Sequence, residues 1–351
     1  MKKLSIFSLG IAIFTMMFGA GDIVFSLHAG KEAGSFIAIT LFGFLITAVC
    51  VPVLGLLSTI LYEGSYHKFL YNLGVVPGAI LIFICMLVIG PFGAIPRCLV
   101  VSYASMHAIF PSLSLFWYSI GISLLIFVLT FRESRVVSIL GRFLGPIKIS
   151  LLVLIIILGF FSFKWFTPSS LTLSQSFVLG LKDGNYSMNL FGGVFFASLV
   201  FEAMRNRMVS DTQTPKSMIR QGVRAGLLGG GLLALIYIGF GVLAAIYSSE
   251  LKNIPQVELL SVLATKVLGF WGGILANLTV AVACLTTAVA LTTVLAEYIS
   301  VEILKNKIPY IWALLLIILI TAGMVNLGFN GIMVVLSPVI GALYPSFIVL
   351  S

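Results

Sequence analysis

The stretch Phe18-Gly19-Ala20-Gly21-Asp22 lies late in the first long apolar segment of this 351-residue chain. Two glycines within three residues weaken a helix, because each costs about 1 kcal/mol relative to alanine. An interrupted helix exposes backbone groups, which a bilayer tolerates only where they line a cavity or contact a ligand. We therefore predict a broken first helix that binds a substrate or a cation, with Asp22 adding charge. The alternative is that the glycines only allow close packing and that Asp22 caps a helix near the outer surface.

The composition of the chain predicts that its solvent is lipid. Hydrophobic residues make up 60% of the sequence and charged residues 9%, whereas soluble domains contain about 25% charged residues. An apolar run of about 20 residues can span a bilayer as a helix. We expect an all-α polytopic membrane protein of one domain, residues 1–351, with about ten spans. The predicted spans lie near residues 4–27, 34–62, 74–109, 113–131, 136–163, 186–204, 221–247, 268–300, 308–326 and 329–350.

The basic residues predict the orientation. A formal charge of +9 could indicate nucleic-acid binding, but Lys and Arg fall in short loops between apolar segments. With the N-terminus inside, most of the 20 Lys and Arg residues lie on the inner side, as the positive-inside rule requires. We therefore predict a protein of the bacterial inner membrane with both termini in the cytoplasm and no nucleic-acid partner. The basic loop at 205–224 is interpreted as a topological anchor.

A second interruption is predicted at the start of the sixth span. The stretch Asn185-Tyr186-Ser187-Met188-Asn189 leads into Phe191-Gly192-Gly193. Laying Phe18-Gly19 on Phe191-Gly192 pairs the first helix of one five-span half with the first helix of the other. Paired broken helices in corresponding halves indicate the binding site of transporters built from inverted repeats.

Other polar residues inside apolar segments have two interpretations each. Thr286 and Thr287 could supply hydroxyl oxygens to a cation such as Na⁺, or could bond their own helix carbonyls. Arg97 follows two prolines and two glycines in span three and is assigned a structural or gating role. Glu202 is interpreted as an ion pair with Arg205. The three histidines fall near span ends, without a metal-ligand companion at suitable spacing: His28, His67 and His107.

An enzyme is the first rival to a transporter. Gly19-Ala20-Gly21-Asp22 satisfies the GxGD pattern of intramembrane aspartyl proteases, whose catalysis needs two carboxylates that share a proton. The other aspartates, Asp183 and Asp211, lie in predicted loops, and Asn189 cannot titrate. The protease interpretation is therefore disfavoured.

Several stretches, in order along nearly the whole chain, resemble a known family. They include Phe18-Gly-Ala-Gly-Asp-Ile-Val-Phe25, Gly43-Phe-Leu-Ile-Thr-Ala-Val-Cys-Val-Pro-Val-Leu54, Gly90-Pro-Phe-Gly-Ala-Ile-Pro-Arg97, Tyr186-Ser-Met-Asn189, Cys284-Leu-Thr-Thr-Ala-Val289, Asn326-Leu-Gly328 and Ser337-Pro-Val-Ile340 with Tyr344-Pro345. The chain resembles the branched-chain amino acid transport carriers of the BrnQ type, the leucine/isoleucine/valine:cation symporter family. The resemblance implies import of these amino acids by alternating access, coupled to Na⁺ or H⁺ and without a cofactor.

The resemblance also implies a fold similar to the leucine-transporter class. Two inverted five-helix repeats, near 4–163 and 186–350, would hold the substrate where helices one and six break. The implied substrate-binding residues are Gly19, Ala20, Gly21, Tyr186, Ser187, Asn189, Phe191 and the span-three aromatic Tyr103. The implied cation site, with Na⁺ as its metal, consists of Asp22, Thr286 and Thr287.

The chain departs from the family pattern at three places. The family usually has Asn at the position of Asp22 and Asp at the position of Asn189. It often has Glu at the position of Ala104, and it normally has twelve spans, so its last two helices are expected to be missing here. A sensor that binds amino acid without transport, a truncated remnant of the carrier, and another small neutral amino acid as substrate therefore remain as alternatives. Protein partners are not predicted.

Overall fold

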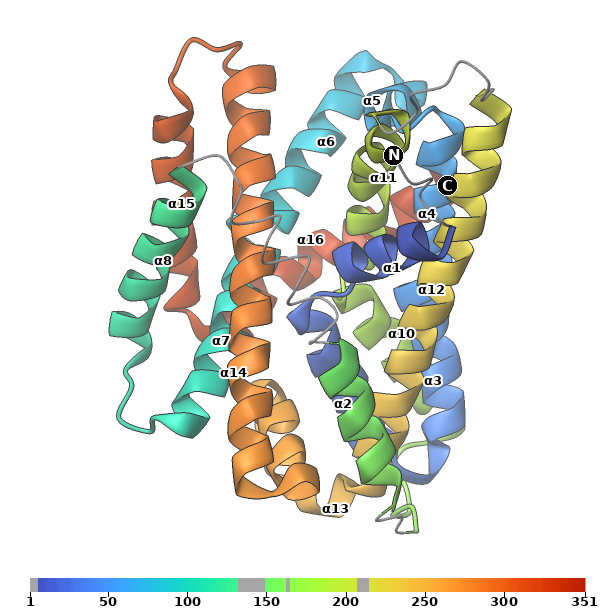
Figure 1. Ribbon diagram of the computed structural model, residues 1–351. Helices are drawn as coiled ribbons and strands as arrows, with labels where there is room; N and C mark the ends of the chain where they lie inside the picture. Colours follow the sequence, from blue (N-terminus) through green and yellow to red (C-terminus); the bar gives the residue numbers. More distant parts are fainter. Residues whose placement is uncertain (1–5, 132–148, 162–164, 207–214, 351) are drawn as a thin grey trace.

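The computed structural model describes residues 6–131, 149–161, 165–206 and 215–350. These residues form helices and connecting turns, and no strand occurs among them (Figure 1). Within them, five helical segments are long and apolar enough to cross a membrane by length and composition, and four shorter apolar helices accompany these. The all-α fold class is thereby confirmed, while the number of spans stays a prediction.

The first span is broken where the glycines predicted a break. Helix α1 covers Ile6–Met17 and helix α2 covers Ala20–Ala33. Gly19 between them has an extended backbone, with φ −88° and ψ 163°, which ends the helical pattern. The Gly19 N–H donates a hydrogen bond of 2.6 Å to Asp22 Oδ2 and a longer one of 3.1 Å to the Met17 carbonyl, so Asp22 caps the start of α2.

The third span is interrupted as its prolines and glycines predicted. Helix α6 covers Val75–Ile89 and helix α7 covers Ala94–Ile109, with a turn at 90–93 between them. The other elements of this half are η1 (Gly34–Phe36), α3 (Ile37–Leu45), the π-helix η2 (Ile46–Cys50), α4 (Val51–Leu61), α5 (Tyr66–Leu70), η3 (Tyr71–Leu73), α8 (Leu115–Phe131) and a helix at Ile149–Phe161.

The sixth span is interrupted within residues 185–189 as predicted, but a helix that was not predicted precedes the break. Residues 164–185 were expected to form a loop, but helix α10 covers Leu173–Tyr186 and helix α11 covers Asn189–Asn206. The break falls at 187–188, where Met188 has a left-handed backbone with φ 60°. Phe191-Gly192 therefore lies inside α11, and its alignment with Phe18-Gly19 at a helix break was wrong.

Helix α10 was missed because polar residues interrupt its apolar pattern. A local signal was nevertheless present in the sequence. Thr172 Oγ1 accepts from the Gln175 N–H and Gln175 Oε1 accepts from the Thr172 N–H. This reciprocal capping box, Ser/Thr followed three residues later by Glu/Gln, marks the first turn of a helix.

The second half contains the longest helices of the described chain. Its elements after α11 are α12 (Pro215–Ile246), α13 (Ser248–Leu251), η4 (Gln256–Glu258), α14 (Leu259–Glu297), the π-helix η5 (Tyr298–Ile303), α15 (Tyr310–Val325) and α16 (Gly328–Leu350). Helix α14 is kinked at Gly269, which has φ 72°. In Figure 1, α14 runs between α8 and α15 on one side and α2, α12 and α3 on the other, and it packs against α7, α15 and α2.

Glycines bring the helices of the core into close contact. A Cβ on Gly30 would collide with the Gly241 carbonyl, and a Cβ on Gly180 would collide with the Thr40 carbonyl. These contacts seat α2 against α12 and α10 against α3, as small residues do at membrane helix interfaces. Large apolar side chains cover the outside instead, with Trp271 80% exposed. This distribution suits a protein whose outer surface contacts lipid.

Candidate binding site at two helix breaks

The two helix breaks face the same small cavity, whose volume is about 60 Å³. The break between α1 and α2 contributes Gly19, Gly21 and Asp22 to its walls, and the break between α10 and α11 contributes residues 187–189. Helices α7 and α14 complete the enclosure. Backbone groups freed at both breaks therefore meet at one place, which is what a bilayer permits only around a cavity or a ligand.

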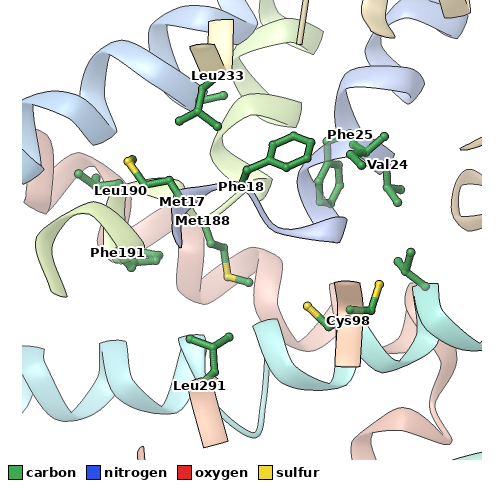
Figure 2. Close-up of a cluster of buried hydrophobic side chains, with 14 of the residues drawn as sticks. Met17, Phe18, Val24, Phe25, Cys98, Met188, Leu190, Phe191, Leu233 and Leu291 are labelled. Carbon is green, nitrogen blue, oxygen red and sulfur yellow. The ribbon is translucent and has the colours of Figure 1, made fainter. Parts of the chain in front are cut away.

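Apolar side chains gather beside this cavity. Figure 2 shows Met17 and Phe18 from the first break close to Met188 from the second, with Leu291 of α14 across from them. Met17, Met188 and Leu291 are all cavity-lining residues, and each is less than one tenth exposed. An aliphatic side chain would find a matching wall here, as ligand pockets are mostly apolar with a few placed polar groups.

Asp22 brings a carboxylate to the cavity wall. The residue is 2% exposed, and its Oδ2 atom caps the first turn of α2 through the Gly19 N–H. A helix N-terminus favours a negative charge, because its unpaired N–H groups carry partial positive charge. Asp22 therefore caps a helix, as the alternative interpretation held. The same carboxylate also lines the cavity of the candidate site.

Arg97 of α7 lies between the two breaks. Its Nη1 atom donates a hydrogen bond of 2.5 Å to the Tyr186 carbonyl at the end of α10. A Cβ built on Gly21 would lie 3.1 Å from Nη2, so the guanidinium also touches the start of α2. Its Cζ atom lies 5.4 Å from the centre of the Phe25 ring, a distance at which a cation is attracted to the ring face.

The polar groups of the second break are tied to neighbouring backbone. Ser187 Oγ donates to the Gly184 carbonyl at 2.7 Å. Asn189 Nδ2 donates to the Ala48 carbonyl at 3.2 Å and to the Tyr237 hydroxyl at 2.8 Å. Both side chains line the cavity and both are buried. The break is therefore held by side-chain hydrogen bonds to α10, η2 and α12.

The other predicted site residues lie elsewhere. Phe191 is fully buried against Tyr344 and Phe347, and the Tyr186 ring packs on Phe25. Tyr103 donates its hydroxyl to the Leu113 carbonyl at 3.0 Å. None of the three predicted residues is part of the cavity lining in the described chain. Ala20 begins α2, and its side chain lies outside the described residues.

Of the three predicted cation ligands, two line the cavity and one does not. Thr287 lines the cavity together with Asp22, whereas Thr286 does not. Both threonine hydroxyls donate to the Ala283 carbonyl, at 2.8 Å for Thr286 and 3.1 Å for Thr287. A donating hydroxyl keeps its oxygen lone pairs, so these bonds leave each oxygen able to coordinate a cation.

A larger cavity of about 240 Å³ adjoins the small one. The two share Ile89, Gly192, Phe196 and Leu291 in their walls. Tyr66 and Glu302 lie at the edge of the larger cavity, where the Tyr66 hydroxyl donates to Glu302 Oε1 at 2.9 Å and His67 Nε2 is 3.1 Å from Oε2. Burial and the Glu302 carboxylate raise the pKa of Tyr66, so its hydroxyl stays a donor.

One largely buried pair was missed by the sequence reasoning. Asp183 was predicted to lie in a loop, but it belongs to α10 and is 4% exposed. Its Oδ2 atom lies 2.7 Å from His28 Nδ1 of α2. The pair joins the helix after the first break to the helix before the second. The capping box at Thr172 was the signal that could have placed Asp183 on a helix.

Two further predictions concern residues without a described side chain. The Glu202 and Arg205 side chains, and residues 207–214 of the basic loop, lie outside the described residues. Among the described residues, no group of three or more His, Cys, Asp or Glu side chains is placed to hold a metal ion.

The fold is similar to that of solved structures of the transporter Mhp1. The inward-facing conformation of Mhp1 aligns with a TM-score of 0.66 at 14% identity, over 99% of this chain and 76% of that one. A closed conformation of Mhp1, a nucleobase-cation-symport-1 family transporter with bromovinylhydantoin bound, gives 0.67 at 13% identity over 98% and 78%. At this identity the likeness shows the fold alone: the chain is a multi-pass membrane protein with a leucine-transporter-like fold.

The family follows from sequence similarity along the full chain. The profile of the family described as branched-chain amino acid transport protein matches residues 2–351, and the chain belongs to this family. The branched-chain amino acid transport system 3 carrier protein of Pseudomonas aeruginosa is 31% identical over all of this chain and 80% of its own length. The branched-chain amino acid permease BrnQ of Escherichia coli K12 is 29% identical with the same coverage. These are transport proteins, so the enzyme alternative is excluded.

Proposed function

We propose that the chain is a secondary symporter that imports leucine, isoleucine and valine together with Na⁺ or H⁺. The observation that carries this proposal is the cavity of about 60 Å³ at which both helix breaks meet. The names of the relatives support the substrate class. The proposed mechanism is alternating access, in which the coupling cation binds one conformation better than the other and thereby shifts the population.

The groups around the cavity suit an aliphatic amino acid. Backbone N–H groups at the start of α2, those of Ala20 and Gly21, are donors for a carboxylate. Carbonyl and side-chain oxygens near Ser187 and Asn189 are acceptors for an ammonium group. The apolar wall formed by Met17, Met188 and Leu291 accommodates a branched side chain. We assign the substrate to this cavity on these grounds.

The coupling cation is assigned to the junction of α2 and α14. Asp22 and Thr287 line the same cavity, and Thr286 precedes Thr287 on the same helix. Carboxylate and hydroxyl oxygens are ligands for a hard cation such as Na⁺. A carboxylate can equally carry a proton, so either cation is compatible with Asp22.

The orientation proposed from the basic residues, with both termini in the cytoplasm, makes the larger cavity a path between the substrate site and the cytoplasm. The chain crosses from one face to the other at each span, so Tyr66 and Glu302 lie on the face that also bears the N-terminus. With both termini in the cytoplasm of a bacterial cell, the cavity of about 240 Å³ leads from the substrate site to the cytoplasm. The repeats near 4–163 and 186–350 belong to this proposal, with α10 added to the second repeat.

Uptake into liposomes tests the proposal. Purified protein is reconstituted, and labelled leucine, isoleucine and valine are supplied under an imposed Na⁺ gradient and then an H⁺ gradient. The expected result is accumulation driven by one of the two gradients and lost in Asp22→Ala. Binding of leucine without accumulation under either gradient would contradict transport and favour the sensor interpretation.

A further inference from the structure

The buried guanidinium of Arg97 has an unused donor. The residue is 3% exposed and lines the cavity at the helix breaks. Nη1 donates to the Tyr186 carbonyl, whereas Nε is buried and has no hydrogen-bond partner among the described residues. A buried donor without a partner is destabilising, and more so on a charged group. The unpaired Nε at a cavity wall therefore points to a ligand that supplies an acceptor.

The charges around the cavity define which ligand fits. Asp22 and Arg97 are the charged residues among those that line it in the described chain. The Asp22 carboxylate and the Arg97 guanidinium interact electrostatically, and their opposite charges cancel. A ligand with net charge would leave an uncompensated charge in a buried cavity, which is strongly unfavourable. A zwitterion with one carboxylate and one ammonium group preserves neutrality.

The geometry points to Arg97 as the residue that binds the carboxylate of the transported amino acid. The Nε and Nη donors of a guanidinium form the planar fork that a carboxylate accepts. As the carboxylate arrives, Arg97 no longer needs Asp22 as its main counter-charge, and Asp22 becomes available to a cation. This assignment rests on the proposed function of the site and changes the earlier structural or gating role of Arg97.

This exchange would also couple substrate to cation. When an amino acid places its carboxylate on Arg97, the Asp22 carboxylate loses its nearby counter-charge and a cation there is favoured, and a cation already at Asp22 likewise leaves Arg97 free for the carboxylate. Each partner therefore raises the affinity for the other, and the effect is reciprocal by linkage. Coupling then arises from one internal ion pair replaced by two intermolecular ones.

A combined change of protein and ligand tests the assignment. Leucine and leucinamide, which lacks the carboxylate, are compared by competition against labelled leucine and by thermal shift, in wild type and in Arg97→Gln. We expect leucine affinity to fall about tenfold or more in the variant, as for a lost charge-assisted hydrogen bond. Leucinamide affinity should not fall, because leucinamide has no carboxylate to bind Arg97 and its ammonium group is attracted to Asp22. Lys266→Gln removes a positive charge that pairs with Glu250 away from the cavity and should change neither affinity.

Further variants keep the test decisive if Arg97→Gln does not fold. The double variant Asp22→Asn/Arg97→Gln leaves no unpaired buried charge and should bind leucine and leucinamide equally weakly. Arg97→Lys keeps the charge and should retain part of the preference for leucine. Equal losses for leucine and leucinamide in all Arg97 variants would overturn the assignment.

The outcomes separate this assignment from the proposed function. If wild-type protein binds leucine by these criteria but does not accumulate it, transport fails and the Arg97 assignment holds. If wild-type protein accumulates leucine but shows no preference for it over leucinamide, the assignment fails and transport holds. A wild-type protein that neither binds nor accumulates leucine, isoleucine or valine overturns both.

Discussion

The two helix breaks interrupt their helices with different backbone conformations. The first break uses Gly19, which is extended, and Asp22, which caps the helix that follows. The second break contains Met188 with φ 60°, a left-handed conformation that costs a non-glycine residue about 1–3 kcal/mol. The first break is therefore stable through local chemistry, whereas the second must be held by contacts with the rest of the protein.

The contacts that hold the second break come from several helices. Asn189 bonds to η2 and α12, and Arg97 of α7 bonds to the last carbonyl of α10. Before the break, Asp183 pairs with His28 and Gly184 lies directly against α3. The comparison teaches that changes in these supports should weaken the protein more than changes at the first break itself.

The largest expected effect is at Gly184. A valine Cβ there would collide with Thr47 Oγ1 and approach the Phe44 carbonyl to 2.7 Å. Because the obstacle includes backbone, Gly184→Val should destabilise the protein by about 3 kcal/mol, the upper part of the range for overpacking. Thermal unfolding of the protein in detergent measures this. Gly121→Val is the matched control, since nothing lies within 4 Å of a Cβ at Gly121, and an equal loss in both variants would contradict the prediction.

The second expected effect is at the buried pair. Asp183→Asn should cost about 1–3 kcal/mol, because the His28 ring, only 17% exposed, loses a charged partner. His67→Gln provides the comparison, since His67 and Glu302 are each 35% exposed and exposed pairs contribute about 0–1 kcal/mol. Thermal unfolding of both variants decides the matter. If the His67 variant lost as much stability as the Asp183 variant, burial would not be the cause.

A third change should affect binding more than stability. A Cβ at Gly21 would lie 3.1 Å from Arg97 Nη2, so Gly21→Ala displaces the guanidinium by a few tenths of an ångström. We expect leucine affinity to fall by about tenfold, which corresponds to about 1.4 kcal/mol, with an unfolding temperature close to that of wild type. Equilibrium binding of labelled leucine measures it, and unchanged affinity would argue against close contact between Gly21 and Arg97.

The smallest effect is expected at the first break. Gly19 has a backbone that other residues adopt, and its Cβ would meet only Asp22 Oδ2, at 3.3 Å. Gly19→Ala should therefore change stability by less than about 1 kcal/mol, because no positive φ requires glycine there. Thermal unfolding beside Gly21→Ala checks this, and a loss as large as that of Gly184→Val would reverse the comparison of the two breaks.

The sequence reasoning succeeded where a local rule was sufficient. The glycines at 19 and 21 predicted the first break, and Gly90-Pro91-Phe92-Gly93 predicted the interruption of the third span. It placed the second break within residues 185–189, where the structure has it, but did not predict the left-handed backbone of Met188, which a non-glycine residue does not favour locally. It misplaced Asp183 in a loop, because polar residues interrupt the apolar pattern of α10, and it placed Phe191-Gly192 at a break although they lie inside α11.

The sequence by itself determined the lipid environment, the all-α class, the first break and the family, because composition, glycine content and motif order are properties of the chain. Only the tertiary structure decided which side chains meet. It placed Arg97 of α7 between two breaks far from each other in sequence, paired Asp183 with His28, and turned Phe191 toward Tyr344 and Phe347. The physical reason is that such contacts depend on how distant helices pack, and no local preference encodes that packing.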